Sequence, residues 1–319
     1  MVKIMTIAIL SRMLTQQPGN YRHQWRKGAT AWLLCLNLAF LPGYADFVVT
    51  DDSGREVSLK QPAQRIVSTA PHVTEMLFAI GAGELIVGAA EFSNYPEAAK
   101  NIPRIGSHSK LNLEKIIELQ PDLVIAWQTG NPESDLNKLA DLEFPVFVSE
   151  PRNLEDIPSN LKRLGTLTGS TGTAEESANE FMALTQSIIE ANKNKKNVRV
   201  FYQVWEQPLM TLNGEHLVSK VIQHCGGENI FSSLNLIAPQ ISIESILQEN
   251  PDVIIAGDIP GAEDEWKQYW KRWPQLQAVA KDQLYSIPAD LIVQHTPRLV
   301  KGMEMMCAIL DQARIAQSE

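Results

Sequence analysis

Residues 112–126 read NLEKIIELQPDLVIA, and residues 242–256 read SIESILQENPDVIIA. Each stretch begins with a residue that favours a helix N-cap, continues as a short amphipathic helix, turns at Pro-Asp and ends in an apolar strand. Glu114 and Glu244 are 130 positions apart (244 − 114), and the two Pro-Asp pairs have the same offset. An ordered pattern repeated at one spacing indicates that the chain contains two similar α/β halves.

Short apolar segments surround the first copy of the repeat. Residues 47–50 and 56–59 flank the turn sequence Asp-Asp-Ser-Gly and predict a β-hairpin. Residues 74–80 predict a helix. Continuous apolar strands that alternate with helices are typical of a parallel sheet covered on both faces. Four segments read as such buried strands: 65–68, 85–88, 123–126 and 145–148.

Residues 171–194, which lie between the two halves, predict one long helix. Ala174, Phe181 and Ile188 are among the apolar residues that recur there at helical spacing, and no Gly or Pro follows Gly172. A single helix is a stiffer connector than two or three extended strands. We therefore expect the two halves to be joined rigidly.

The first 45 residues have the three-part pattern of a secretory signal peptide. Arg22, Arg26 and Lys27 form a basic region, and residues 29–41 form an apolar run too short to span a bilayer. Small residues follow at 43 and 45, so we expect cleavage before Asp46 and export, with a retained membrane anchor as the alternative. The expected division is a signal peptide at 1–45, an N-terminal lobe at 46–168, a connecting helix at 169–196 and a C-terminal lobe at 197–319.

Charge and cysteine content exclude several classes of protein. The net charge of −9 argues against nucleic-acid binding, which needs a basic surface. Residues 1–45 hold five cations and no acid, so their removal takes the charge to −14 and leaves two of the three cysteines, Cys225 and Cys307. In an oxidising compartment this pair predicts a disulfide that would stabilise the fold by about 4 kcal/mol, the alternative being two buried free thiols. The sequence contains no CxxC pair, so it gives no indication of a structural zinc site.

No catalytic motif stands out in the sequence. It contains no GxSxG, GxxxxGK[ST] or HExxH motif, and no GxGxxG follows a predicted strand. An enzyme could place its residues on separate loops, so this absence is weak evidence. It favours a binding protein over an enzyme.

Ten segments follow one another in an order that is specific for one family: 49–55, 64–68, 74–75, 94–96, 112–114, 125–127, 130–131, 224–231, 239–242 and 297–298, together with Cys307. On these segments the chain resembles the periplasmic binding proteins of ABC importers for vitamin B12, haem and ferric siderophores, and within that family its cobalamin-binding members. Proteins of this family consist of two Rossmann-like lobes joined by a rigid helix, with the ligand in the cleft between them. The resemblance implies a monomeric periplasmic receptor that has no cofactor, captures cobalamin and delivers it to the permease of an inner-membrane importer.

The resemblance also implies roles for individual residues. Glutamates that match Glu114 and Glu244 dock onto permease arginines, although both would also suit a first helical turn for its dipole alone. The cysteines that match Cys225 and Cys307 are bridged.

The expected ligand pocket departs from the family pattern at several positions. Trp127 and Asp290 match pocket residues of the cobalamin-binding members directly, and Trp205 follows a strand near the expected cleft. The other candidates replace family residues: Phe92 a tyrosine, Met210 a phenylalanine, His108 and Ala238 each a tryptophan, and Gln294 an arginine. Aromatic platforms with a few polar groups suit a large ring that carries amide side chains.

Three histidines are expected at loop positions that face the cleft. A neutral imidazole at His72, His108 or His295 could ligate cobalt or haem iron, but ordinary polar cleft residues are the favoured interpretation. We therefore predict no resident metal site, with His108 as the one candidate ligand.

Two alternatives remain open for the function. Haem or a ferric siderophore could replace cobalamin, although siderophore complexes are usually anionic and would favour several arginines, where only Arg104 and Arg298 are obvious. A secreted metal-dependent enzyme that uses His108, His295 and Asp290 is a remoter alternative.

Overall fold

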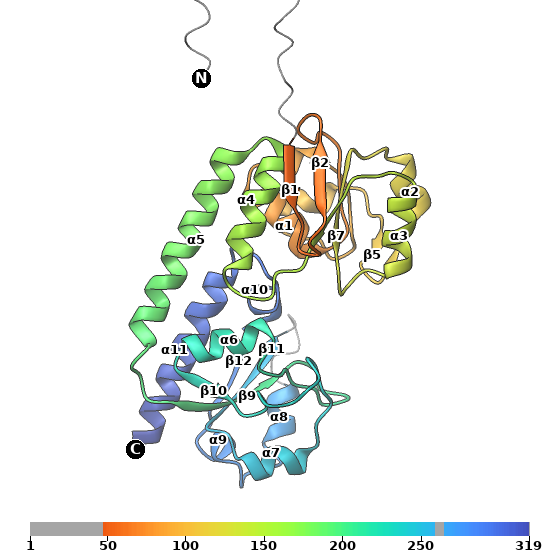
Figure 1. Ribbon diagram of the computed structural model, residues 1–319. Coiled ribbons are helices and arrows are strands. Elements are labelled where there is room, and N and C mark those ends of the chain that lie inside the picture. Colours follow the sequence, from red (N-terminus) through yellow and green to blue (C-terminus); the bar gives the residue numbers. More distant parts are fainter. Residues whose placement is uncertain (1–46, 259–264, 319) are drawn as a thin grey trace, which may run out of the picture. The chain divides into compact units, whose positions relative to one another are not determined.

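The computed structural model describes residues 47–258 and 265–318 (Figure 1). The expected signal peptide at 1–45 lies outside these residues. Among the helices that the structure describes, none is long and apolar enough to cross a membrane.

The N-terminal half contains a parallel sheet with strand order β4-β3-β7-β8. Its strands are almost fully buried, which explains their continuous apolar character. The strands are β3 (Ile66–Ser68), β4 (Ile86–Ala89), β7 (Leu123–Trp127) and β8 (Val146–Ser149). Its other elements are β1 (Phe47–Thr50), β2 (Glu56–Leu59), β5 (Gly106–Ser107), β6 (Lys110–Leu111), α1 (Pro71–Ala79), η1 (Gly83–Leu85), η2 (Glu97–Asn101), α2 (Leu113–Glu118), α3 (Glu133–Asp141) and α4 (Asp156–Thr168).

The C-terminal half contains a second parallel sheet, with strand order β10-β9-β11-β12. Its strands are β9 (Val198–Gln203), β10 (Gly227–Asn229), β11 (Val253–Asp258) and β12 (Leu284–Pro288). Its helices are α6 (Leu217–His224), α7 (Ile243–Glu249), α8 (Glu265–Trp270), α9 (Gln277–Ala280), α10 (Ala289–Ile292) and α11 (Leu299–Ser318). Two sheets of the same type confirm the expected α/β fold.

The repeated stretch forms the same structure in both halves. Each N-cap side chain accepts a hydrogen bond from the backbone N–H three residues on, at 3.0 Å from Lys115 to Asn112 and 3.3 Å from Ser245 to Ser242. The aspartate carboxylate of each Pro-Asp turn then accepts hydrogen bonds from the backbone near the start of the neighbouring strand. Asp122 accepts from the backbone N–H groups of residues 64 and 65, and Asp252 accepts from that of residue 199. The aspartate thereby aligns two parallel strands.

Several element boundaries differ by one to three residues from those expected. Helix α1 begins at Pro71 rather than Thr74, because proline fits the first helical position, where its missing N–H has no partner to lose. Strand β4 begins at Ile86 because Leu85 ends the short turn η1.

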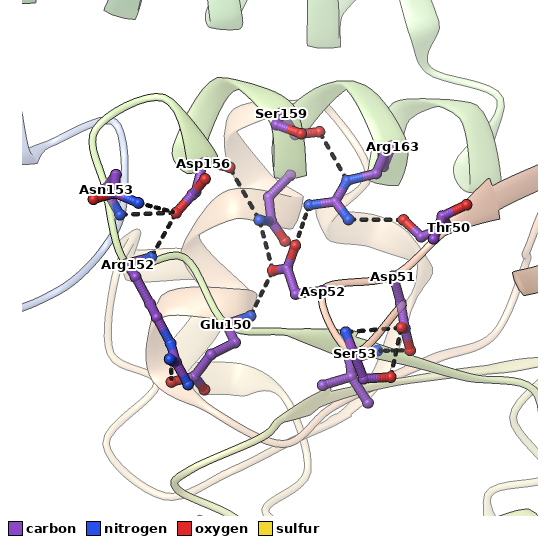
Figure 2. Close-up of polar contacts among 12 residues, drawn as sticks. Thr50, Asp51, Asp52, Ser53, Glu150, Arg152, Asn153, Asp156, Ser159 and Arg163 are labelled. Carbon is purple, nitrogen blue, oxygen red and sulfur yellow. Dashed lines mark hydrogen bonds and ion pairs between the residues drawn. The ribbon is translucent and has the colours of Figure 1, made fainter. Parts of the chain in front are cut away.

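The β1–β2 hairpin is confirmed, and its turn is anchored to the rest of the N-terminal half (Figure 2). The buried carboxylate of Asp51 accepts from backbone N–H groups within the turn and from Val148 on β8. Asp52 accepts from the backbone of Glu150 and pairs with Arg163 on α4. These contacts hold the hairpin against β8 and α4.

Helix α5 (Thr171–Asn192) lies in the chain between the two sheets. It packs against α4 of the N-terminal half and against α6 and α11 of the C-terminal half. A continuous apolar cluster includes Leu164, Phe181 and Leu310, and so contains residues of both halves and of α5. The expected disulfide is confirmed: Cys225, which caps α6, is bonded to Cys307 on α11, with a Cα–Cα distance of 4.7 Å.

Candidate functional site

A cavity of about 610 Å³ is lined by residues of both halves. It brings together three of the predicted ligand-binding residues, namely Phe92, Asp290 and Gln294. Two of them follow the ends of parallel strands: Phe92 comes shortly after β4, and Asp290 lies on α10, directly after β12. Loops at the carboxyl ends of parallel strands are the usual place for a ligand in such folds.

Phe92 presents its ring to solvent at the cavity. Its side chain is 70% exposed, that of nearby Tyr95 is 46% exposed, and the backbone at Phe92 has a φ of 66°, which is strained for a bulky residue. Arg104 supports this loop, donating to the carbonyls of Ala90 at 3.3 Å and Ser93 at 3.0 Å. Arg104 therefore acts on the loop, and the loop holds an aromatic face open to a ligand.

Arg298 is the central charge of the cavity. It donates to both carboxylate oxygens of Glu75, from Nε at 2.8 Å and Nη2 at 2.6 Å, and to Asp290 from Nη1 at 2.9 Å. Its guanidinium also lies over the ring of Tyr95, 3.7 Å from the centroid. Burial opposes its charge, but the hydrogen bonds and charges of Glu75 and Asp290 outweigh this and raise the pKa of Arg298.

Trp127, at the end of β7, lies among imidazoles rather than in the lining of this cavity. Its ring centroid is 5.4 Å from that of His72 and 5.5 Å from that of His108. A Cβ at Gly130 would collide with the indole, so Gly130 packs directly on the ring. Trp127 and His108, both predicted for the ligand pocket, thus lie side by side, and His72 is next to the lining residue Pro71.

Asn131 links the backbone of Trp127 to that of His108. Its buried side chain accepts from the backbone N–H of Trp127 at 2.7 Å and from the Thr69 hydroxyl at 2.6 Å. Its amide nitrogen donates to the backbone carbonyls of His108 at 2.8 Å and Thr69 at 3.3 Å. A single amide therefore fixes two candidate ligand residues from different loops, a role that no local sequence pattern reveals.

Three histidines, of which His72 is buried and His216 and His295 are partly buried, follow one another from α1 to the C-terminal half. The ring centroid of His295 is 6.4 Å from that of His72 and 6.1 Å from that of His216. Burial lowers the pKa of His72 to about 3 and the pKa values of His216 and His295 to about 4, with the neighbouring imidazoles adding to the effect at His72 and His295. All three are neutral at pH 7.

The remaining pocket candidates lie on another part of the C-terminal half. Trp205 pairs with Met210 in an isolated bridge, and Met210 pairs in turn with Gln240. Trp205 is 52% exposed, and Leu236 and Ile237 beside Ala238 are also exposed. None of these residues lines the 610 Å³ cavity, nor do Trp127 and His108, so three of the seven predicted ligand-binding residues line it.

Glu114 and Glu244 occupy equivalent exposed positions in the first turns of α2 and α7. Glu114 also lines a second cavity of about 750 Å³ in the N-terminal half. The backbone N–H of its own residue and the hydroxyl of Ser242 lower the pKa of the Glu244 carboxyl, which is ionised at neutral pH.

Sequence reasoning missed Glu75 and Tyr95 as cavity residues, although both belong to segments that carried the family resemblance. Glu75 and Arg298 are 223 residues apart, so no spacing rule could pair them. Within residues 47–258 and 265–318, no cluster of three or more His, Cys, Asp or Glu side chains is arranged to hold a metal ion.

Comparison with known proteins identifies the family. Residues 66–291 match the periplasmic binding protein family. The chain is 36% identical to a vitamin B12-binding protein of Vibrio cholerae over 259 residues, which cover 81% of this chain and 92% of the relative. A vitamin B12-binding protein of Pectobacterium atrosepticum is 34% identical over 80% of this chain and 91% of its own length.

Solved structures agree with this assignment. The crystal structure of the periplasmic vitamin B12 binding protein BtuF of Vibrio cholerae matches 81% of this chain and 99% of its own, with a TM-score of 0.75 and 36% identity. The periplasmic heme-binding protein RhuT from Roseiflexus has the same fold, with a TM-score of 0.70 and 23% identity. These relatives bind substrates and are not enzymes. The chain is a binding protein that belongs to the periplasmic binding protein family.

Proposed function

We propose that the protein captures cobalamin in the cleft between its two halves and delivers it to an inner-membrane ABC transporter. The observation that carries the proposal is the cavity itself, whose aromatic wall of Phe92 and Tyr95 faces solvent while its guanidinium is already paired. A large ring with uncharged amide side chains suits such a surface. The similarity to vitamin B12-binding proteins over most of the chain supports the same ligand.

Charge favours cobalamin over an anionic siderophore. The two arginines that sequence analysis offered as anion receptors are both engaged, Arg104 with backbone carbonyls and Arg298 with two carboxylates. Lys100, which also lines the cavity, pairs with Glu97. An anionic complex would have to displace these partners.

The candidate residues then receive distinct roles. Trp127 and Phe92 provide apolar faces for the ring, and Asp290, Gln294 and His108 provide polar contacts that orient it. Trp205 and Met210 form an apolar edge in the C-terminal half that contacts a ligand larger than the 610 Å³ cavity. Cobalamin is cargo in this scheme, and no resident cofactor takes part.

Delivery uses the two equivalent glutamates. Glu114 and Glu244 are exposed at the same position of a repeated helix in each half, so one transporter with two similar permease subunits can contact both. A role in helix capping alone would explain the acidity of each position. It would not explain why an exposed acid recurs at the same point of both halves.

The chain organisation follows from the same function. Residues 46–168 and 197–319 act as two lobes, residues 169–196 connect them through α5, and residues 1–45 direct export to the periplasm and are removed. In support, α5 packs against helices of both halves and one apolar cluster continues through it. The receptor acts as a monomer.

Calorimetric titration with cyanocobalamin tests the ligand, using protein purified from the periplasm of cells that express the full chain. We expect tight one-to-one binding, with haem titrated in parallel and binding less well. Binding of haem alone would preserve the importer class and remove cobalamin as the ligand. Mass spectrometry of the same sample tests the cleavage at residue 45.

A further inference from the structure

Glu75 is a buried acid on α1 that pairs with a residue of the other half of the chain, Arg298. Its carboxylate, 4% exposed, accepts two hydrogen bonds from Arg298, whose side chain is 13% exposed. Two parallel bonds between a guanidinium and a carboxylate are the strongest form of this pairing. The pair therefore closes off the side of Arg298 that would otherwise receive an acidic ligand.

The remaining surfaces of Arg298 are also occupied. Nη1 donates to Asp290, whose side chain is 53% exposed, and the ring of Tyr95 covers one face of the guanidinium. One positive charge thus meets two negative charges at the cavity wall. A ligand carboxylate at this wall would meet a net negative group, while an amide would meet hydrogen-bonding groups without that repulsion.

We propose that Glu75 is a specificity-determining residue that excludes anionic ligands from the cleft by holding Arg298 in an internal ion pair. The inference rests on the proposed capture of cobalamin, whose ring periphery carries uncharged amides. Glu75 makes no contact with the ligand in this scheme; it acts through the charge and position of Arg298.

The variant Glu75→Gln tests this inference, because it keeps the shape of the side chain and removes its charge. We expect haem, which carries two propionates, to bind the variant roughly tenfold more tightly than the wild type, since a charge-assisted hydrogen bond to Arg298 becomes available. Cyanocobalamin affinity should change much less than haem affinity. Haem binding is followed by its absorbance and cyanocobalamin binding by calorimetry.

A matched pair of ligands isolates the charge from the shape. Cyanocobalamin is compared with its monocarboxylates, in each of which one ring amide is hydrolysed to a carboxylate. The wild type should prefer the amide to those monocarboxylates whose acid lies at the cavity wall. The variant should lose or reverse this preference.

Two further variants control for trivial effects. Glu91→Gln changes the net charge equally one position from the cavity residue Phe92, but Glu91 is exposed and does not hold Arg298, so haem affinity should stay near the wild-type value. Glu75→Gln combined with Arg298→Gln should lose the gain in haem affinity. Thermal unfolding of each variant confirms that it is folded.

The outcomes separate this inference from the proposed function. If the folded Glu75→Gln variant gains no affinity for haem or for the monocarboxylates, or if Glu91→Gln gains as much, Glu75 does not set the specificity. If the wild type fails to bind cyanocobalamin, the proposed ligand is wrong, while the haem comparison still reports on Glu75.

Discussion

The indole ring of Trp127 is held in place by its immediate neighbours. Gly130 packs on the ring, His72 and His108 lie beside it, and Asn131 accepts from its backbone N–H. Such support keeps a flat apolar face in one orientation before the ligand arrives, which reduces the ordering cost of binding. In the proposed binding role of Trp127, residues that do not touch the ligand would therefore affect its affinity.

Gly130→Ala should weaken cobalamin binding by displacing the indole, because the added methyl group occupies the position of the ring. The loss should approach that of Trp127→Ala, for which we expect roughly 1–3 kcal/mol in calorimetric titration. Gly172→Ala is the matched control, since a Cβ there has nothing within 4 Å. Equal affinities of Gly130→Ala and wild type would remove Trp127 from the binding surface or show that the ring can shift freely.

His72 couples folding stability to pH. Its pKa is about 3 in the folded protein and 6.5 when exposed, so the unfolded chain takes up a proton first as the pH falls. Its contribution to stability is complete above pH 6.5 and is lost as the pH falls from there toward 3, by about 1.4 kcal/mol per pH unit.

Urea denaturation of wild type and His72→Gln between pH 7 and pH 4.5 measures this coupling. The free energy of unfolding should fall with acidification in both proteins, because His216 and His295 also titrate in this direction. The slope of the unfolding free energy against pH should be shallower in the variant, by up to the change of about 1.4 kcal/mol per pH unit that uptake of one proton causes. Identical slopes would mean that His72 is accessible to protons in the folded state.

Helices α2 and α7 belong to the repeated stretch, and each carries one of the two glutamates proposed to contact the transporter. The stretches that form them are repeated in the sequence, so their helices, Pro-Asp turns and strands could be predicted before the structure was known. The start of α1 at Pro71 was not predicted, because proline usually interrupts a helix, and only the structure shows it at the first helical position. The partners of Asp122 and Asp252 are non-local and needed the structure.

Replacing Glu114 and Glu244 together by Ala should abolish transport and leave cobalamin affinity unchanged, because both side chains are exposed and lie outside the 610 Å³ cavity. Uptake of labelled cobalamin by cells that depend on this receptor measures the first effect, and calorimetry the second. Replacing Glu175 and Glu176 on α5 by Ala gives the same change in charge and should not affect uptake. Normal uptake by the Glu114/Glu244 variant would contradict the docking role.

At the scale of the whole molecule, contacts distant in sequence join the two halves. The sequence predicted the α/β class, the long helix and the disulfide, because each depends on local pattern or on cysteine number. It did not predict the ion pair of Glu75 with Arg298 or the separation of Trp205 from the 610 Å³ cavity, since both depend on how loops from different halves meet.

Replacing Cys225 and Cys307 by Ala should lower the free energy of unfolding by about 4 kcal/mol, because the bridge closes a long loop in the unfolded chain. Urea denaturation under oxidising conditions measures the loss. Dithiothreitol should lower the stability of the wild type and leave that of the variant unchanged. Equal stability of the two oxidised proteins would show that the bridge adds nothing to the fold.

The disulfide between α6 and α11 also makes the stability of the protein differ between the newly made chain and the mature one. Disulfides form after a chain leaves the reducing cytosol, so a newly made chain lacks this part of its final stability. A less stable precursor unfolds more readily and is easier to thread through a translocation channel. In the proposed periplasmic receptor, the bond would thus be absent during translocation, the stage at which extra stability would slow transfer across the membrane.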